Sequence, residues 1–173
     1  MKKLLLILLI TFPLDSALPQ SKSVTVSPLS ITFHPKVNDV VAHEFSNLYL
    51  GSRRNTLHPG LHIKYVSDVL THSAWAFKDS FGNLGGGYMV GAQFSFLRYF
   101  AIGGMGGIYV RERVPKAVAD FPVSIKTGGI EASPVGGISI SAEVPINNVY
   151  GVEATCLLNV IANNCNVGFK IKW

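Results

Sequence analysis

Cys165-Asn166-Val167-Gly168-Phe169-Lys170-Ile171-Lys172-Trp173 is the clearest structural signal in this chain of 173 residues. Apolar residues alternate in this stretch with small or polar ones, and it finishes on an aromatic residue. Successive side chains of a β-strand point to opposite faces of the sheet. The stretch therefore predicts a strand with one apolar face and one polar face.

An export signal is expected at the other end of the chain. Lys2 and Lys3 precede an apolar run over residues 4–10, which is the order of charges and apolar residues in a secretory signal peptide. The run is shorter than the roughly 20 apolar residues that a helix needs to span a bilayer. We expect residues 1–17 to form the signal peptide, with a cleavage site that Asp15 makes hard to define.

The terminal strand and the export signal together resemble the outer-membrane β-barrels of bacteria. This resemblance implies a location in the cell outer membrane, with phospholipid and lipopolysaccharide as contacting lipids. The composition agrees, because charged residues make up only 14% of the chain and it contains 17 glycines. The net charge of +5 includes the lysines of the expected signal peptide, and no cluster of basic and aromatic residues favours nucleic acid. We expect a monomer without a cofactor.

Eight alternating segments predict an all-β fold, an eight-stranded antiparallel transmembrane β-barrel over residues 40–173. Their lengths are close to the about 9–11 residues of a tilted membrane strand. Residues 18–39 contain three prolines and are interpreted as a periplasmic lead-in. A further apolar stretch at 121–125 could add a strand at the rim. The expected strands are residues 40–51, 59–67, 73–81, 84–97, 99–111, 134–144, 149–157 and 165–173.

The alternation also predicts which side chains point into the barrel. Glu143, Glu153 and Lys170 should point inward, since a charged side chain facing lipid costs a few kcal/mol at mid-depth. Both signs of charge are present, so we expect an internal ion-pair network. Six glycines share the inward parity and could leave room for an acyl chain, or could instead relieve crowding where the barrel bends. They are Gly85, Gly87, Gly91, Gly103, Gly107 and Gly137.

The two cysteines, Cys156 and Cys165, fall on adjacent expected strands with the same outward parity. An exported chain with two cysteines most simply forms one disulfide. The alternative is a pair of free buried thiols. We expect no metal site, because the five histidines lack ligand spacing and the cysteines do not form a CxxC motif.

One short motif resembles a known enzyme family. Ala76-Phe77-Lys78-Asp79-Ser80-Phe81 resembles a stretch at the extracellular end of the third strand in the lipid A palmitoyltransferases (PagP). Similarity continues in Gly86-Gly87-Tyr88 and in the asparagine-rich residues 163–167. The resemblance implies that Asp79 and Ser80 belong to an active site that moves an acyl chain from phospholipid to lipid A.

The catalytic histidine of that family has no counterpart at a matching position. His43 lies near the inner end of the first expected strand, whereas His58 lies near the outer end of the second, beside the motif. His58 could therefore act as a general base for Ser80, or it could be a solvated loop residue. His62 should point into the lumen with Lys64. His72 and Ser73 are expected at a periplasmic turn.

The sequence thus supports two functions of different classes. One is acyl transfer to a glycolipid, with Ser80, Asp79 and His58 as catalytic residues. The alternative is a non-catalytic surface barrel in envelope remodelling, adhesion or host-surface masking, for which the motif is only a polar rim. A third interpretation, a soluble secreted β-sandwich, would require a second sheet to cover the apolar faces.

Overall fold

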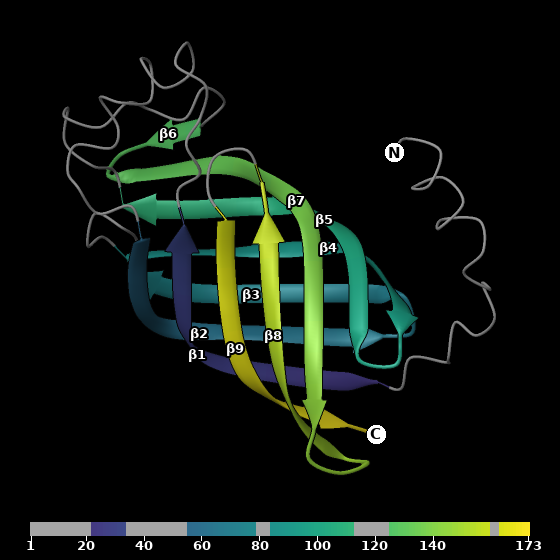
Figure 1. Cartoon of the computed structure of the whole chain (residues 1–173). Coiled ribbons are helices and arrows are strands. Elements are labelled where there is room, and N and C mark those ends of the chain that lie inside the picture. The colour runs from purple at the N-terminus through teal and green to yellow at the C-terminus, as the bar shows by residue number, and fades with distance from the viewer. Residues whose placement is uncertain (1–21, 34–54, 79–83, 113–124, 160–162) are drawn as a thin grey trace, which may run out of the picture.

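The computed structural model describes residues 22–33, 55–78, 84–112, 125–159 and 163–173. The strands in this part of the chain form one antiparallel sheet in the order β5-β4-β3-β2-β1-β9-β8-β7-β6. Because β5 also pairs with β7, eight of these strands close into a barrel, and β6 lies outside the closure (Figure 1). The strands are β1 (Ser23–Phe33), β2 (Asn55–Ser67), β3 (Leu70–Lys78), β4 (Leu84–Leu97), β5 (Phe100–Glu112), β6 (Ile125–Thr127), β7 (Ile130–Pro145), β8 (Tyr150–Leu158) and β9 (Asn163–Lys172).

The predicted eight-stranded antiparallel barrel is confirmed, but its first strand is not where the sequence placed it. β1 occupies Ser23–Phe33, inside the stretch interpreted as a periplasmic lead-in. It closes the barrel by pairing with β2 on one side and β9 on the other. The expected first strand, residues 40–51, lies outside the described residues, as does the expected signal peptide.

A β-bulge at Pro28 explains why β1 was missed. Its register shifts between Ser27 and Leu29 against β2, and between Val26 and Leu29 against β9. Proline has no N–H to donate and is tolerated at bulges. The bulge also changes the parity, so Ser23, Thr25 and Ser27 are buried before it and Ser30 and Thr32 after it. A proline that resembled a strand breaker therefore marks an irregularity inside a strand.

The two ends of the barrel differ. At one end, which we call the turn end, Ser23 of β1 pairs with Lys172 of β9, and short turns join β2 to β3, β4 to β5 and β7 to β8. Asp68, in the first of these turns, has a positive φ of 55°, which aspartate tolerates better than most residues. The opposite end, which we call the loop end, carries β6.

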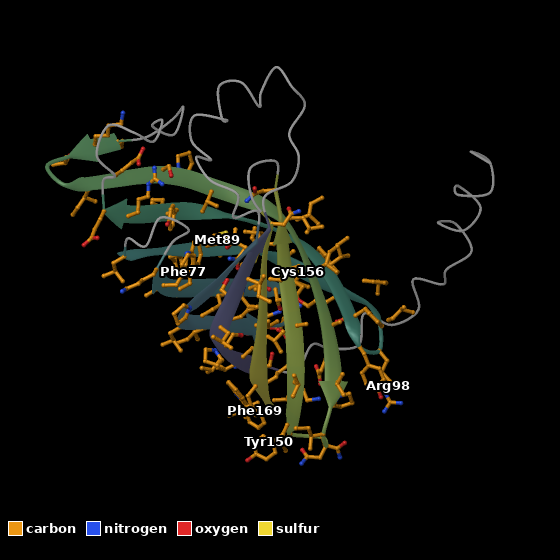
Figure 2. All side chains as sticks on the ribbon, turned by 60° about the vertical axis from the view of Figure 1, so that its left-hand side comes forward. Phe77, Met89, Arg98, Tyr150, Cys156 and Phe169 are labelled. Atoms are coloured by element: carbon orange, nitrogen blue, oxygen red, sulfur yellow. A yellow bond between two sulfur atoms is a disulfide. The ribbon has the colours of Figure 1, made fainter. Side chains whose placement is uncertain are left out.

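The polarity of the barrel is the reverse of that of a water-soluble protein. Among the described residues, only four hydrophobic residues are buried, against eighteen polar or charged ones. Large apolar side chains such as Phe94, Ile138 and Val167 are exposed on the outer surface. Figure 2 shows Tyr150 and Phe169 side by side there, with ring centroids 5.6 Å apart. No second sheet covers this surface in the described part of the chain, contrary to the β-sandwich interpretation.

The described residues contain no helix that is long and apolar enough to cross a membrane.

A three-stranded ledge extends β5 and β7 at the loop end. Ile130–Ala132 of β7 pairs with residues 110–112 of β5 on one side and with β6 on the other. β6 shares only Ile125 with the expected rim strand at 121–125, whose other residues lie outside the described residues.

The position of β1 can be tested with a lipid-facing charge. Val26 is 39% exposed on the outer face of β1, so Val26→Arg should cost on the order of 2–4 kcal/mol if this residue lies near mid-depth in a bilayer. We expect a lower folded fraction, measured by heat-modifiable migration on gels, while Val26→Leu should fold normally. Normal folding of Val26→Arg would contradict a barrel that begins at β1.

Candidate functional site

Five charged side chains form a continuous chain of ion pairs inside the barrel, which we call the charge network. Lys64 and Lys170 each contact Glu153, at 2.6 and 2.8 Å, and Lys170 and Lys172 each contact Glu143, at 2.9 and 2.6 Å. Exposure of the side chains rises along it, from 1% at Lys64 to 19% at Lys172. The predicted inward direction of Glu143, Glu153 and Lys170 is confirmed, and so is the internal ion-pair network.

Lys64 occupies the innermost position of the charge network. Its Nζ lies 2.9 Å from the Ser141 hydroxyl, 3.1 Å from that of Thr155 and 3.2 Å from the Gln93 carbonyl oxygen. These partners belong to β7, β8 and β4, so the side chain of one β2 residue reaches three other strands. A buried ammonium group is tolerated only when it is paired and hydrogen-bonded, and Lys64 meets both conditions.

Glu153, the partner of Lys64, is also fully engaged. Its Oε1 accepts hydrogen bonds from the hydroxyls of Thr25 and Thr155, at 3.1 and 3.0 Å, and its Oε2 contacts Lys170. Thr25 belongs to β1 and Lys170 to β9. The charge network therefore ties together the two strands whose pairing joins the beginning and the end of the barrel.

A buried histidine–serine pair lies beside the charge network. His62 Nε2 is 2.6 Å from Ser73 Oγ, and both residues are buried. The predicted inward direction of His62 is confirmed. Ser73, expected at a turn, instead faces the lumen from β3, while His72 points outward and shares a hydrogen bond with the Tyr88 hydroxyl. The pair is thus part of the buried polar interior of the barrel.

The structure gives only partial information on the predicted catalytic residues. Asp79 and Ser80 lie outside the described residues, and β3 ends one position earlier at the exposed Lys78. His58 lies within β2, where its backbone pairs with Ser30. Gly60 of β2 pairs with Phe77 of β3, so His58 is on the strand beside the one that leads to the motif.

The inward glycines lie close to neighbouring side chains and strands. A Cβ on Gly87 would lie 2.4 Å from the Trp75 ring, and one on Gly85 would lie 2.5 Å from the Tyr109 hydroxyl. Large aromatic side chains therefore fill the space that these two glycines provide. At the other four positions, a Cβ would meet a backbone carbonyl oxygen of the adjacent strand at 2.3 Å or less; these are Gly91, Gly103, Gly107 and Gly137. The glycines thus allow close packing of rings and strands.

A second buried ion pair lies toward the loop end. Arg111 donates from Nε and from one terminal nitrogen to Glu131 Oε2, at 2.9 and 2.7 Å. The two residues are direct neighbours on β5 and β7, and both are buried. This pair joins β5 to β7 within the ledge. The sequence analysis missed it, although both residues sit on the inward parity of their strands.

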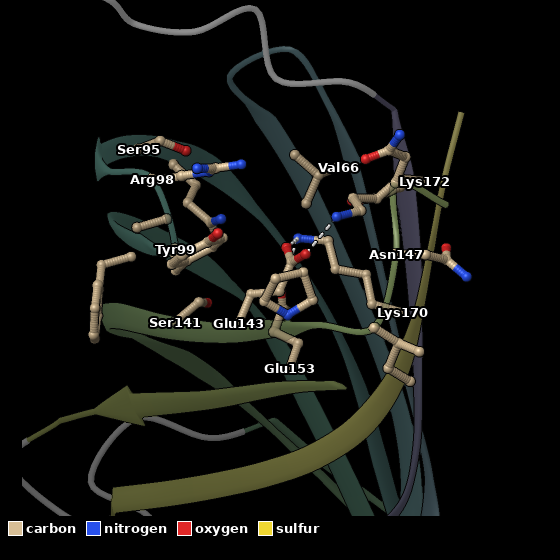
Figure 3. A pocket seen from close by; sticks show the side chains of 17 residues that line it. Val66, Ser95, Arg98, Tyr99, Ser141, Glu143, Asn147, Glu153, Lys170 and Lys172 are labelled. Atoms are coloured by element: carbon tan, nitrogen blue, oxygen red, sulfur yellow. Dashed lines mark hydrogen bonds and ion pairs between the residues drawn. The ribbon is translucent and has the colours of Figure 1, made fainter. Parts of the chain in front are cut away.

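A polar cavity of about 450 Å³ opens at the turn end, where sequence reasoning predicted no site. Figure 3 shows Arg98 and Tyr99 on one side of it and Lys170 and Lys172 on the other, with Glu143 between them. The exposed Asn147, in the turn between β7 and β8, also lines it. Within the described residues, no group of histidine, cysteine or acidic side chains could hold a metal ion.

The predicted disulfide is confirmed. Cys156 of β8 and Cys165 of β9 are direct cross-strand neighbours and are bonded to each other. A crosslink that closes a loop of this length stabilises a fold by about 2–3 kcal/mol in the chain-entropy account. It secures the β8–β9 hairpin toward the loop end, away from the turn-end cavity.

No protein-family model and no curated protein sequence matches this chain. Among solved structures, the chain is similar to Ail, the attachment invasion locus protein of Yersinia pestis, which was crystallised in complex with the heparin analogue sucrose octasulfate. The two are 11% identical with a TM-score of 0.40, over 88% of this chain and 97% of that one. At this level of similarity, nothing about function carries over from Ail.

The central role of Lys64 can be tested by substitution. Lys64→Met would leave Glu153 buried without its closest partner, which should cost on the order of 3 kcal/mol. Lys172→Met, which removes the most exposed member of the charge network, should cost about 1 kcal/mol or less. Urea unfolding of the barrel in lipid vesicles measures both, and equal losses would contradict a structure centred on Lys64.

Proposed function

We propose that this protein is a non-catalytic barrel of the bacterial outer membrane that presents its loop end to partners at the cell surface. The observation that carries the proposal is the inverted polarity of the closed barrel. Its outer surface is apolar and its lumen is occupied by paired charges and aromatic rings. A closed barrel satisfies its backbone hydrogen bonds internally, which insertion into lipid requires.

Aromatic residues near the turn end support this placement. The rings of Tyr65 and Trp173 stack with centroids 6.4 Å apart, and those of Phe96 and Phe100 lie 6.1 Å apart. Aromatic girdles of this kind sit at the level of the lipid headgroups. Short turns face the periplasm in outer-membrane barrels, so the loop end would face the outside of the cell.

The interior supports a binding function over acyl transfer. A hydrocarbon-measuring pocket would need continuous apolar space in the lumen. Instead, Trp75 and Tyr109 take up the space beside two of the inward glycines, and Arg111, which forms an ion pair with Glu131, lies directly opposite Gly85. Contact with a partner would then rely on surfaces at the loop end.

The ledge offers such a surface. Ile125 and Ile130 are 76% and 54% exposed there, on β6 and β7. Exposed apolar side chains on a rigid sheet are typical of protein–protein contact sites. The Arg111–Glu131 ion pair joins β5 to β7 within the ledge, so this surface is ordered before a partner binds.

Adhesion by the ledge can be measured after expression in a non-adherent bacterium. We expect cells that carry the protein to attach to host-cell monolayers and their lipid A masses to stay unchanged. The double variant Ile125→Asn/Ile130→Asn should lose most of the attachment, because it removes the apolar contact surface. Ile146→Asn, at an exposed turn-end position, is the matched control and should attach normally. Attachment by the ledge variant equal to that of the parent protein would refute this role.

A second candidate is acyl transfer from phospholipid to lipopolysaccharide, and it rests on the motif at residues 76–81. β2, which contains His58, is the neighbour of β3, the strand that leads into the motif. In this case expression should add an acyl chain to lipid A, and Ser80→Ala should abolish the added mass without loss of folding. Substitution of His58 or Asp79 by alanine should slow transfer by roughly 10²–10⁴-fold if either assists proton transfer. Unchanged lipid A masses on expression of the parent protein would eliminate this candidate.

A further inference from the structure

The cations at the turn-end cavity have hydrogen-bonding capacity that the barrel does not use. Lysine has three donors, yet within the described part of the chain Lys172 pairs only with Glu143, and Lys170 only with Glu143 and Glu153. Among the described residues, the guanidinium group of Arg98 lies over the Tyr99 ring at 5.2 Å and makes no hydrogen bond. The unused hydrogen-bond donors therefore all belong to positively charged groups.

The carboxylates of the cavity, by contrast, are already neutralised. Glu143 forms ion pairs with Lys172 through Oε1 and with Lys170 through Oε2. Glu153 forms ion pairs with Lys64 and Lys170. The lining therefore holds three cations against two anions, and Lys64, which contacts the lining residue Glu153, adds a further positive charge. A ligand that complements this cavity must carry negative charge and accept hydrogen bonds.

The size of the cavity and the positions of its polar groups restrict which anionic ligands would fit. Its volume of about 450 Å³ is that of a small organic molecule, and its lining includes hydroxyl and amide groups such as Ser95 and Asn148. Arg98 and Lys172 approach from opposite sides (Figure 3). A tetrahedral anion with several oxygens can accept hydrogen bonds from both sides at once, as phosphate does with arginine and lysine.

We propose that the turn-end cavity binds a phosphate-bearing small molecule, with Arg98 and Lys172 as the principal phosphate contacts. Lys170 contributes its remaining donor, and the polar lining contacts the rest of the ligand. The phosphate belongs either to a soluble phosphate monoester or to the headgroup of an anionic phospholipid in the adjacent leaflet.

Binding can be measured by calorimetry on the full-length protein folded in an uncharged detergent. We expect saturable binding of inorganic phosphate and of glycerol 3-phosphate, and none of glycerol. Arg98→Gln, which breaks no ion pair, should weaken binding about tenfold or more, because it removes a charge-assisted hydrogen bond. Lys172→Gln should act in the same direction. Lys22→Gln removes the same charge from an exposed lysine that does not line the cavity, and should bind like the parent protein.

Three results would overturn the proposal. One is the absence of saturable phosphate binding below about 10 mM, which corresponds to negligible affinity. Another is binding that Arg98→Gln leaves unchanged. The third is an equal loss in Arg98→Gln and Lys22→Gln, which would indicate general attraction to a positive surface.

Nanodiscs of two lipid compositions distinguish a lipid headgroup from a soluble monoester as the source of the phosphate. If a lipid headgroup occupies the cavity, phosphate should bind less tightly in phosphatidylglycerol discs than in phosphatidylcholine discs, and Arg98→Gln should remove that difference. If the ligand is a soluble monoester, any difference between the two lipids should be the same in the parent protein and in Arg98→Gln.

Discussion

Burial of the Lys64 ammonium group inside a closed barrel is the constraint on which the rest of the structure depends. A charge held away from water must be matched by opposite charge and by hydrogen-bond acceptors. Glu153 supplies the charge, and Gln93, Ser141 and Thr155 supply acceptors from three other strands. These contacts require a particular alignment of distant strands. The polar interior thereby specifies how the strands align when the barrel closes. The apolar exterior does not, because apolar contacts are non-directional.

The charge network also separates the two ends of the molecule. From Lys64 it runs toward the turn end, where its outer members line a polar cavity. Toward the loop end, the lumen contains aromatic rings packed against glycines and the Arg111–Glu131 pair. The turn end therefore offers unused cationic donors, and the loop end offers an exposed apolar ledge. One small barrel can in this way carry two chemically different surfaces at its opposite ends.

The glycines illustrate how the same residue pattern supports different interpretations. Their inward parity was predicted correctly, because it follows from strand alternation. Their role depends on what lies across the strand or the lumen. Trp75 and Tyr109 occupy the space beside Gly87 and Gly85, and backbone carbonyl groups approach the other inward glycines. Local parity alone could not distinguish a cavity from close packing.

The sequence by itself determined most strands, the inward charges and the Cys156–Cys165 pair, because these depend on a period of two along each strand and on neighbouring hairpin strands. It misplaced β1, because a bulge at Pro28 interrupts that period. Only the tertiary structure decided the partners of Lys64, which lie 29 to 91 residues away in the chain, and the cavity at the turn end. Both arise when β1 meets β9 and β5 meets β7 in the closed barrel, and no local pattern records which side chains that closure brings together.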